Sequence, residues 1–226
     1  MPPRVKTPPD RSPDGDDAAG GAGRGAATGH PRSTWRAQQA SVTRDRIADA
    51  ARGLFASRGY GSTSIDSIAA EAGVAVRTVY ATFGNKREIL SHICGAWLDR
   101  AGAREAARDV LAEPDTAQRL HRAARWLTHL YSAGFDVVEI LESATDDSPE
   151  TRELLRAKLA GRDHVMDEMI ASIAPDLTVP LAEAQAMFRG LAAPPLYREL
   201  VVVGGWSPDR LADWLADVLH AHLLVR

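Results

Sequence analysis

The sequence predicts an all-α protein, and three observations support this fold class. After residue 40, apolar residues recur at spacings of three and four, as they do in helices that bury one face. No segment shows the alternation of apolar and polar residues that a half-buried strand requires. Helix-start signals, in which Ser or Asn precedes Pro or Glu at the appropriate spacing, separate the periodic segments.

Length and charge indicate two domains with different roles. The chain has 226 residues, enough for a module of about fifty residues and a larger helical domain with its own core. Residues 31 to 90 hold nine Arg or Lys and five Asp or Glu, whereas residues 91 to 226 hold fourteen and twenty-one. A basic module beside an acidic body lets only one end of a molecule approach phosphate groups.

The first 38 residues are dominated by Pro, Gly, Ala, Asp and Ser, with Val5 as the only branched aliphatic residue. Such a composition buries too little apolar surface to offset the entropy of ordering. We expect a disordered tail over residues 1–38, a DNA-binding domain over 39–92 and a helical domain over 93–226. No run approaches the length of a membrane span, and the N-terminus lacks the apolar core of a signal peptide, so we expect a cytoplasmic protein.

The first two helices follow from apolar periodicity and capping residues. A helix from Ser41 to Arg58 is predicted to end at Gly59, which suits a left-handed C-cap. Thr63, with Asp66 three positions later, predicts a capping box that opens a short second helix. The apolar positions of the two helices are Ile47, Ala50, Ala51, Leu54 and Phe55, then Ile65, Ile68, Ala69 and Ala72.

A third helix, from Val76 to about Thr82, follows a tight turn at Gly73 and points Val79 inward. Ala69 and Gly73 supply the small residue and the permissive turn that two steeply crossing helices require. The pattern favours a helix-turn-helix whose second helix enters a DNA major groove, although a helical hairpin inside a core is the alternative. Its outward residues are Val76, Arg77, Thr78, Tyr80, Ala81 and Thr82.

Asn85, with Glu88 three residues on, opens a longer fourth helix that extends through Leu98. Further helices are expected at about 115–133, 135–144, 149–173, 181–203 with a break at Pro194 and Pro195, and 208–224. Ser148 and Ser207 each precede a proline and mark two of these starts clearly.

The N-terminal motif as a whole resembles the DNA-binding domain of the TetR family of bacterial repressors, over about residues 42 to 95. The residues that carry the resemblance are Ile47, Ala48, Ala50, Ala51, Leu54, Phe55, Gly59, Tyr60, Thr63, Ser64, Ile65, Ile68, Ala69, Ala72, Gly73, Val74, Thr78, Val79, Tyr80, Phe83, Lys86, Ile89 and Leu90. The remaining body resembles the family in helical character and length, and the segments 195–200 and 206–208 look like the C-terminal region of some members.

The resemblance implies that Thr63, Tyr80 and Lys86 contact phosphates, which suits helix N-termini and a positive charge. It also implies that Arg77 and Thr78 face base edges, and Arg77 could form a bidentate contact to guanine. Val76 would meet a thymine methyl, and Arg44 is a further candidate for phosphate. Ala75, Ala81 and Thr82 depart from residues common in the family. These departures leave docking to DNA intact, but the operator sequence cannot be inferred.

For the body, the resemblance implies a small-molecule ligand, dimerisation through the last two helices, and a ligand-dependent spacing of two DNA-reading heads. Candidate pocket residues are Trp97, Trp126, His129, Leu130, Tyr131, Phe135, Asp136, Glu139, Glu142 and Met166, although aromatic residues at helical spacing also form cores. The apolar residues expected in the dimer interface are Leu196, Leu200, Val201, Val203, Leu211, Trp214, Leu215, Val218 and Leu219.

Enzymatic and metal functions are not expected. His220 and His222 point to different helix faces, the single Cys94 allows no thiolate cluster, and no nucleophile-base pair or phosphate-binding loop appears. We expect no cofactor and no metal. The partners expected are operator DNA, a second copy of the chain and an unidentified small molecule. The alternatives are a helical binding protein without operator function and a helical enzyme, for which the sequence offers no catalytic set.

Overall fold

The computed structural model describes residues 31–224, and helices make up most of them. The helices are α1 (Pro31–Arg58), α2 (Ile65–Ala72), α3 (Val76–Phe83), α4 (Lys86–Arg100), α5 (Ala103–Ala112), α6 (Thr116–Ser132), α7 (Phe135–Ser143), α8 (Pro149–Ala171), α9 (Leu181–Leu191), α10 (Pro194–Tyr197) and α11 (Pro208–Leu223), with a 3₁₀ turn η1 (Ala174–Asp176) and a π-helix η2 (Arg198–Val203). Within residues 31–224 no strand forms, and the only β pairing is an isolated bridge between Leu177 and Leu224. The predicted all-α fold class is confirmed.

The chain divides into two units, residues 1–38 and residues 39–226. Residues 1–30 of the predicted tail lie outside the described residues. Residues 31–38 were expected to be disordered, but they form the start of α1, ten residues before the predicted start at Ser41. Pro31 at the first helical position, followed by good helix formers such as Ala37, Gln38 and Gln39, accounts for this longer helix.

Helices α1 to α4 surround one small core, to which each contributes at least one fully buried residue. Ile47 of α1, Ile68 of α2, Val79 of α3 and Ile89 of α4 are each at most 1% exposed. Helix α1 ends as predicted at Gly59, whose backbone has a φ of 82° and whose N–H donates to the Phe55 carbonyl. Because α4 continues unbroken to Arg100, the predicted domain boundary at 92/93 falls inside a helix shared by both parts.

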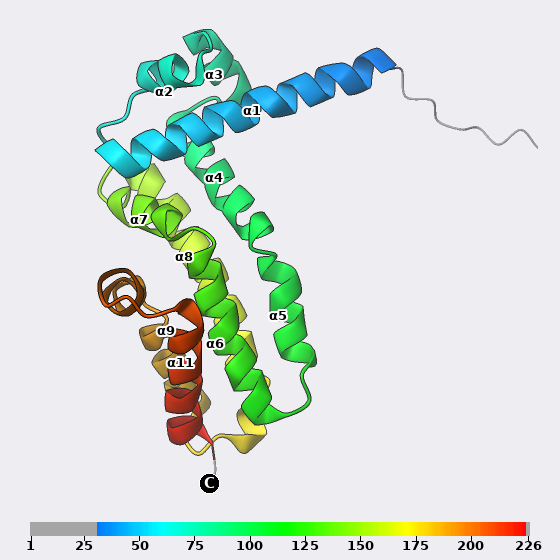
Figure 1. Cartoon of the computed structure of the whole chain (residues 1–226), viewed down its shortest axis with the longest axis vertical. Coiled ribbons are helices and arrows are strands. Elements are labelled where there is room, and N and C mark those ends of the chain that lie inside the picture. The colour runs from blue at the N-terminus through cyan, green and yellow to red at the C-terminus, as the bar shows by residue number, and fades with distance from the viewer. Residues whose placement is uncertain (1–30, 225–226) are drawn as a thin grey trace, which may run out of the picture. The chain divides into compact units, whose positions relative to one another are not determined.

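The body is organised around α6, which packs along α11 and also contacts α5, α7 and α8 (Figure 1). Helix α9 packs against α8 and also contacts α11, which joins these helices to the rest of the body. Buried residues there include Leu127, Met166, Phe188 and Leu219. The body therefore has an extensive apolar core of its own, continuous with the core of α1 to α4.

Helix α5 is absent from the sequence-based expectation. It begins after Gly102, which has a φ of 57°, and buries Ala103, Ala107 and Val110. Two of these three inward positions are alanines, whose side chains give a weak periodic signal. The predicted helix starts at Ser148 and Ser207 are confirmed, because each hydroxyl accepts a hydrogen bond from the backbone N–H three residues later.

The expected break near Pro194 is also present, but the chain after it differs from the prediction. Helix α9 stops at Leu191, α10 covers only Pro194–Tyr197, and residues 198–203 wind as a π-helix instead of continuing as an α-helix. Long π-helices are rare and occur mostly at functional or strained places.

Candidate nucleic-acid interface and ligand site

The turn between α2 and α3 has the geometry that the sequence predicts. Gly73 lies in the left-handed region with φ 63° and ψ 38°, and the N–H of Val74 donates to the Ala69 carbonyl at 3.0 Å. Ala69 is 2% exposed, as a residue at a close helix crossing should be. From α1, the Arg46 guanidinium donates to the Ala72 carbonyl at 2.6 Å, which satisfies the end of α2 and fixes it to α1.

The cap of α2 is Ser64, and the prediction that Thr63 caps this helix is wrong. The Ser64 hydroxyl accepts from the Ser67 N–H, and the Ser67 hydroxyl accepts from the Ser64 N–H, so the capping box is shifted by one residue. Thr63 is only 3% exposed, and its hydroxyl donates to the Gly59 carbonyl at 2.9 Å. The Thr63 hydroxyl, which was predicted to contact phosphate, thus satisfies a backbone carbonyl at the end of α1. Ser64 occupies the exposed position at the start of α2.

Helix α3 presents the outward face expected of a recognition helix. Arg77, Tyr80 and Ala81 are exposed, and Tyr80 is 52% exposed although its ring is large and apolar. Val76, Thr78 and Thr82 are half-buried at its edges, and Val79 and Phe83 are buried as predicted. Ala75 caps the helix without a side-chain hydrogen bond, which leaves N–H groups at its start free of side-chain acceptors.

The ammonium group of Lys86, at the start of α4, is held by contacts to other residues of the protein. Its Nζ donates to the Tyr60 carbonyl at 2.9 Å, lies 4.1 Å from the centroid of the Tyr60 ring, and is 3.5 Å from a carboxylate oxygen of Asp147. Burial raises the pKa of the Tyr60 hydroxyl, which is consistent with a tightly packed ring. A phosphate would have to compete with Asp147 for this ammonium group. The cap of α4 itself is as predicted, since Asn85 accepts from the Glu88 N–H.

Arg44 connects α1 to the end of the recognition helix. Its guanidinium donates to the Thr82 carbonyl at 3.1 Å and lies 4.9 Å from the centroid of the Phe83 ring. A small polar cavity of about 300 Å³ opens here, lined by Arg44, Thr82, Phe83, Glu88, Ser91 and His92. Arg44 contacts the end of α3, and Arg46 contacts the end of α2. Helix α1 therefore has one guanidinium contact to each helix of the helix-turn-helix. The sequence suggested Arg44 only as a phosphate contact and gave no signal for Arg46.

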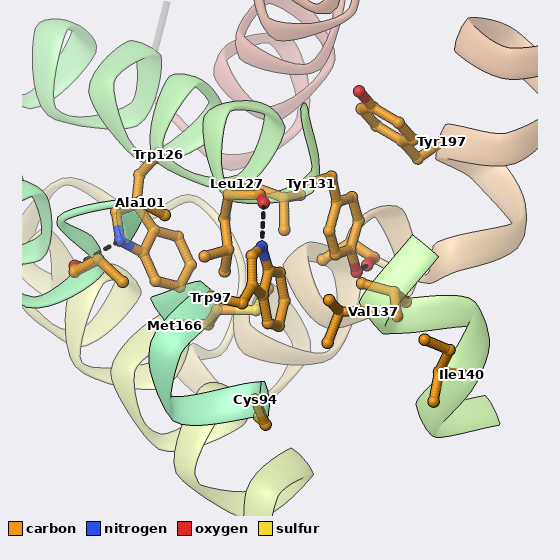
Figure 2. Packing of buried hydrophobic residues seen from close by; sticks show 14 of the residues in the cluster. Cys94, Trp97, Ala101, Trp126, Leu127, Tyr131, Val137, Ile140, Met166 and Tyr197 are labelled. Atoms are coloured by element: carbon orange, nitrogen blue, oxygen red, sulfur yellow. Dashed lines mark hydrogen bonds between the residues drawn. The ribbon is translucent and has the colours of Figure 1, made fainter. Parts of the chain in front are cut away.

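Most of the apolar candidates for the ligand pocket fill the core of the body. Trp97, Leu130, Tyr131 and Met166 are each at most 5% exposed. Figure 2 shows Trp97 among Leu127, Tyr131, Val137 and Met166, with its indole N–H directed to a backbone carbonyl. That acceptor is Leu130, at 3.0 Å. Helical spacing cannot separate a core aromatic residue from a pocket one, and here these residues pack against each other.

Phe135 joins an aromatic cluster at the end of α6. Its ring centroid lies 4.8 Å from that of Tyr197 and 5.7 Å from that of Tyr131, and the Tyr131 hydroxyl donates to the Ala192 carbonyl. Burial raises the pKa of Tyr131, and Arg162 partly opposes this effect. The cluster therefore joins α6, α7 and α10 through ring packing.

The three acidic candidates on α7 are paired with arginines from distant parts of the chain. Asp136 accepts two hydrogen bonds of 2.6 Å from Arg52 of α1, and this contact lowers the pKa of the carboxyl group. Glu139 and Glu142 accept from Arg198 at 3.2 and 2.6 Å. The sequence does not reveal these partners, because the pairs join residues 56 to 84 positions apart.

His129 and Trp126 are the two candidates that line a cavity. It has a volume of about 360 Å³ and lies between α5, α6 and the start of α11. Its lining residues are Ala106, Asp109, Val110, Arg122, Arg125, Trp126, Thr128, His129, Ser132, Pro208 and Asp209. Trp126 is nearly buried, and its indole N–H donates to the Ala103 carbonyl at 2.9 Å (Figure 2).

The predicted dimer face is only partly exposed. Leu211, Leu215 and Leu219 are at most 2% exposed, because they form the side of α11 that packs against α6. Their inclusion in an interface was wrong, since their own protomer already covers them. Val203 and Trp214 remain exposed, at 71% and 36%. The π-helix adds Val202, 59% exposed, which the sequence-based set lacked.

Among residues 31–224, no group of three His, Cys, Asp or Glu side chains is placed to hold a metal ion. Over the same range, no helix combines the length and the apolar character needed to cross a membrane.

Comparison with known proteins agrees with this geometry. Residues 47–93 match the sequence model of the bacterial regulatory proteins of the tetR family. No curated protein sequence matches the chain. The matched segment begins in the middle of α1 and ends in α4, so it covers the helix-turn-helix and the parts of the two helices that support it.

Solved structures of similar fold extend over most of the chain. NalD of Pseudomonas aeruginosa, the secondary repressor of the MexAB-OprM multidrug efflux pump, is 20% identical, with a TM-score of 0.66 over 83% of this chain and 98% of its own. FadR of Bacillus subtilis, in complex with stearoyl-CoA, is 19% identical, with a TM-score of 0.63 over 77% and 96%.

A third similar structure is a transcriptional regulator of the TetR/AcrR family from Thermobifida fusca. It is 25% identical, with a TM-score of 0.57 over 78% of this chain and 95% of its own. The segment 47–93 thus carries the family's sequence signature, and more than three quarters of the chain shares the fold of these regulators. The segment 47–93 of this chain is therefore identified as a DNA-binding segment of the tetR family of bacterial regulatory proteins.

Proposed function

We propose that this DNA-binding transcription regulator is a homodimeric repressor that acts in the cytoplasm and leaves its operator when a small molecule binds the body. The observation that carries the proposal is the exposed face of α3, in which Arg77 and Tyr80 project from a helix whose other side is fixed to α1, α2 and α4. A helix held in this way can enter a major groove without a rearrangement of the fold.

The contacts divide into those that read bases and those that hold the backbone. Arg77 and Thr78 lie near the start of α3, where side chains of a recognition helix reach base edges, and Val76 offers a methyl contact. Tyr80 is exposed and would donate to a phosphate, as would the exposed Ser64 at the start of α2. We retain Lys86 as a phosphate contact that forms only when its ammonium leaves Asp147.

A second copy of the chain would complete the operator-binding unit. Val202, Val203 and Trp214 are exposed apolar residues near the C-terminus, where two copies related by a two-fold axis could bury them. Two recognition helices about 34 to 36 Å apart would then read successive major grooves of a near-palindromic site.

Release by a small molecule is supported by the relatives and by the body's own geometry. The Bacillus subtilis structure is a complex with stearoyl-CoA, so a regulator of this fold can bind a small molecule. In the present chain, Arg52 of α1 is bound to Asp136 of α7, so a ligand that moves α7 would also move α1. Such a ligand must bind the free form more tightly than the DNA-bound form.

The direct test is nuclease protection of the DNA around the protein's own gene, followed by titration of the protected fragment at several salt concentrations. A regulator of this kind protects a near-palindromic site, and its affinity falls steeply as salt rises because phosphate contacts release counterions. Uniform, weak protection of every fragment would leave the alternative of a helical binding protein without operator function.

A further inference from the structure

The cavity between α5, α6 and α11 combines charges of both signs with an apolar surface. Arg122 and Arg125 come from α6, Asp109 from α5 and Asp209 from the first turn of α11. The apolar part of the lining consists of the edges of two nearly buried side chains, Val110 and Trp126. Its volume of about 360 Å³ lies within the range of sites that hold small organic ligands.

Arg125 and Asp209 form an ion pair that a ligand can replace. Arg125 donates to Asp209 at 2.8 Å, but the two side chains are 50% and 78% exposed. An ion pair so open to water contributes little to stability, so opening it costs little. Arg122 is held more firmly, because it pairs at 2.6 Å with Glu113, whose side chain is only 12% exposed.

We propose that this cavity binds a small zwitterion of the α-amino acid type. The ligand's carboxylate accepts from the Arg125 guanidinium, whose planar N–H groups suit two carboxylate oxygens. Its ammonium group donates to the Asp209 carboxylate, and its side chain lies against Val110 and the edge of the Trp126 indole. A ligand with both charges replaces the Arg125 to Asp209 pair at both ends and leaves neither group without a partner.

Such a ligand would act on the packing of α6 against α11. The Arg125 to Asp209 pair joins these helices at the start of α11, and His121 contacts Asp213 one turn further along at 3.0 Å. Inserting a ligand into the first pair shifts the start of α11, and the exposed Trp214 lies in the next turn. The effect of the ligand on regulation rests on the proposed function, a repressor released by a ligand. The binding site itself does not depend on that proposal.

The first experiment is calorimetric titration of the full chain, without DNA, with L-leucine and L-phenylalanine as zwitterionic probes. Matched analogues lack one charge each: L-leucinamide has no carboxylate, and 4-methylpentanoate has no ammonium group. We expect at least one amino acid to bind at least about tenfold more tightly than both single-charge analogues, since each lost charge-assisted hydrogen bond weakens binding by that order. Failure of both amino acids to bind, or equal affinity for the analogues, would overturn the proposal.

The second experiment locates the site. Arg125→Gln and Asp209→Asn should each weaken binding of the amino acid by at least about tenfold. Arg156→Gln is the matched control, because Arg156 is a 70% exposed arginine of α8 outside the cavity lining, and it should leave binding unchanged. All three side chains are at least half exposed, so thermal unfolding should show intact folds. Unchanged affinity in both cavity variants would place the ligand elsewhere and refute the site.

Operator titration of the same samples separates the two proposals. A chain that binds its operator but neither amino acid refutes the zwitterion site alone. A chain that binds an amino acid but no operator refutes the repressor proposal alone.

Discussion

The guanidinium of Arg52 in α1 donates two hydrogen bonds of 2.6 Å to the carboxylate of Asp136 in α7. Arg52 lies on the same helix as Arg44 and Arg46, which bind carbonyls at the ends of α3 and α2. Helix α1 thus has guanidinium contacts to both helices of the helix-turn-helix and to the body. A displacement of α7 can therefore reach both helices of the helix-turn-helix through α1.

The first prediction concerns the energy of this pair. Arg52→Gln and Asp136→Asn should each lower the free energy of unfolding by about 1 kcal/mol, because each leaves a partly buried partner without its contact. The double variant should be about as stable as either single variant, since the contact can be lost only once. Denaturant unfolding of the four proteins measures the coupling, and strictly additive losses would show that the two residues do not stabilise each other.

The same pair predicts a dependence of stability on pH. Hydrogen bonds from Arg52 lower the pKa of Asp136 below its ordinary value of 3.8 in the folded protein. A lowered folded-state pKa means that the stabilisation is complete above the unfolded-state value and is lost as the pH falls through the folded-state value. The difference in unfolding free energy between wild type and Asp136→Asn should therefore be constant from about pH 5 to 8 and shrink on acidification below 3.8. A difference that grew on acidification would contradict this assignment.

The recognition helix predicts two kinds of DNA-binding defect. Tyr80→Ala should weaken binding to matched and mismatched operators about equally, because a phosphate contact carries no sequence information. Arg77→Ala should instead reduce discrimination at one base pair, by about 1 to 3 kcal/mol. Titration against a panel of single-base operator changes distinguishes the two. If Tyr80→Ala altered base preference and spared total affinity, the assignment of Tyr80 to the phosphate backbone would be refuted.

The contacts of Lys86 predict that its loss affects both stability and operator binding. Its position at a helix start alone would predict only the effect on DNA. Lys86→Ala removes the contacts to the Tyr60 carbonyl and to Asp147, so it should lower stability by about 1 kcal/mol as well as weaken operator binding. Arg87→Ala, a change of the neighbouring cation on α4, is the control for net charge. Asp147→Asn should strengthen operator binding, because it releases the ammonium group towards phosphate. Weaker binding in that variant would mean that Asp147 positions Lys86 for DNA.

The exposed apolar residues after α10 predict the oligomeric state. Val203→Glu should give monomers by light scattering, because a two-fold interface would bury this charge opposite its own copy. Leu159→Glu is the control, since Leu159 is 49% exposed on α8 and lies outside the proposed face. Leu215→Glu is expected to unfold the protomer instead, as Leu215 is 1% exposed against α6. A Val203→Glu protein that stayed dimeric would move the interface elsewhere.

The sequence predicted the helix-turn-helix well because its determinants are local. Gly73, Asn85 and the buried positions Ile68 and Val79 act within a few residues of chain, so spacing is enough to identify them. The one-residue error at Thr63 arose because Thr63 and Ser64 can both cap a helix. Only the fold shows that the Thr63 hydroxyl is needed at the end of α1.

The cavity between α5, α6 and α11 could not be predicted in the same way. Trp97 and Trp126 have similar local patterns and both are buried in the core, yet only Trp126 also borders a cavity, and this difference depends on α5 and α11. The pairs Arg52 with Asp136 and Arg125 with Asp209 join residues 84 positions apart. Helical periodicity carries no information about which charged side chain meets which at that separation.

The π-helix Arg198–Val203 makes the surface around Val202 and Val203 tolerant of the loss of one residue. A π-turn completes its rotation with about one residue more than an α-turn, in which each residue turns the chain by about 100°. Loss of one residue between positions 198 and 203 would let this segment wind as a regular helix and leave the two valines on nearly the same side. Gain of a residue outside this turn has no such compensation and would rotate whatever follows it by about 100°.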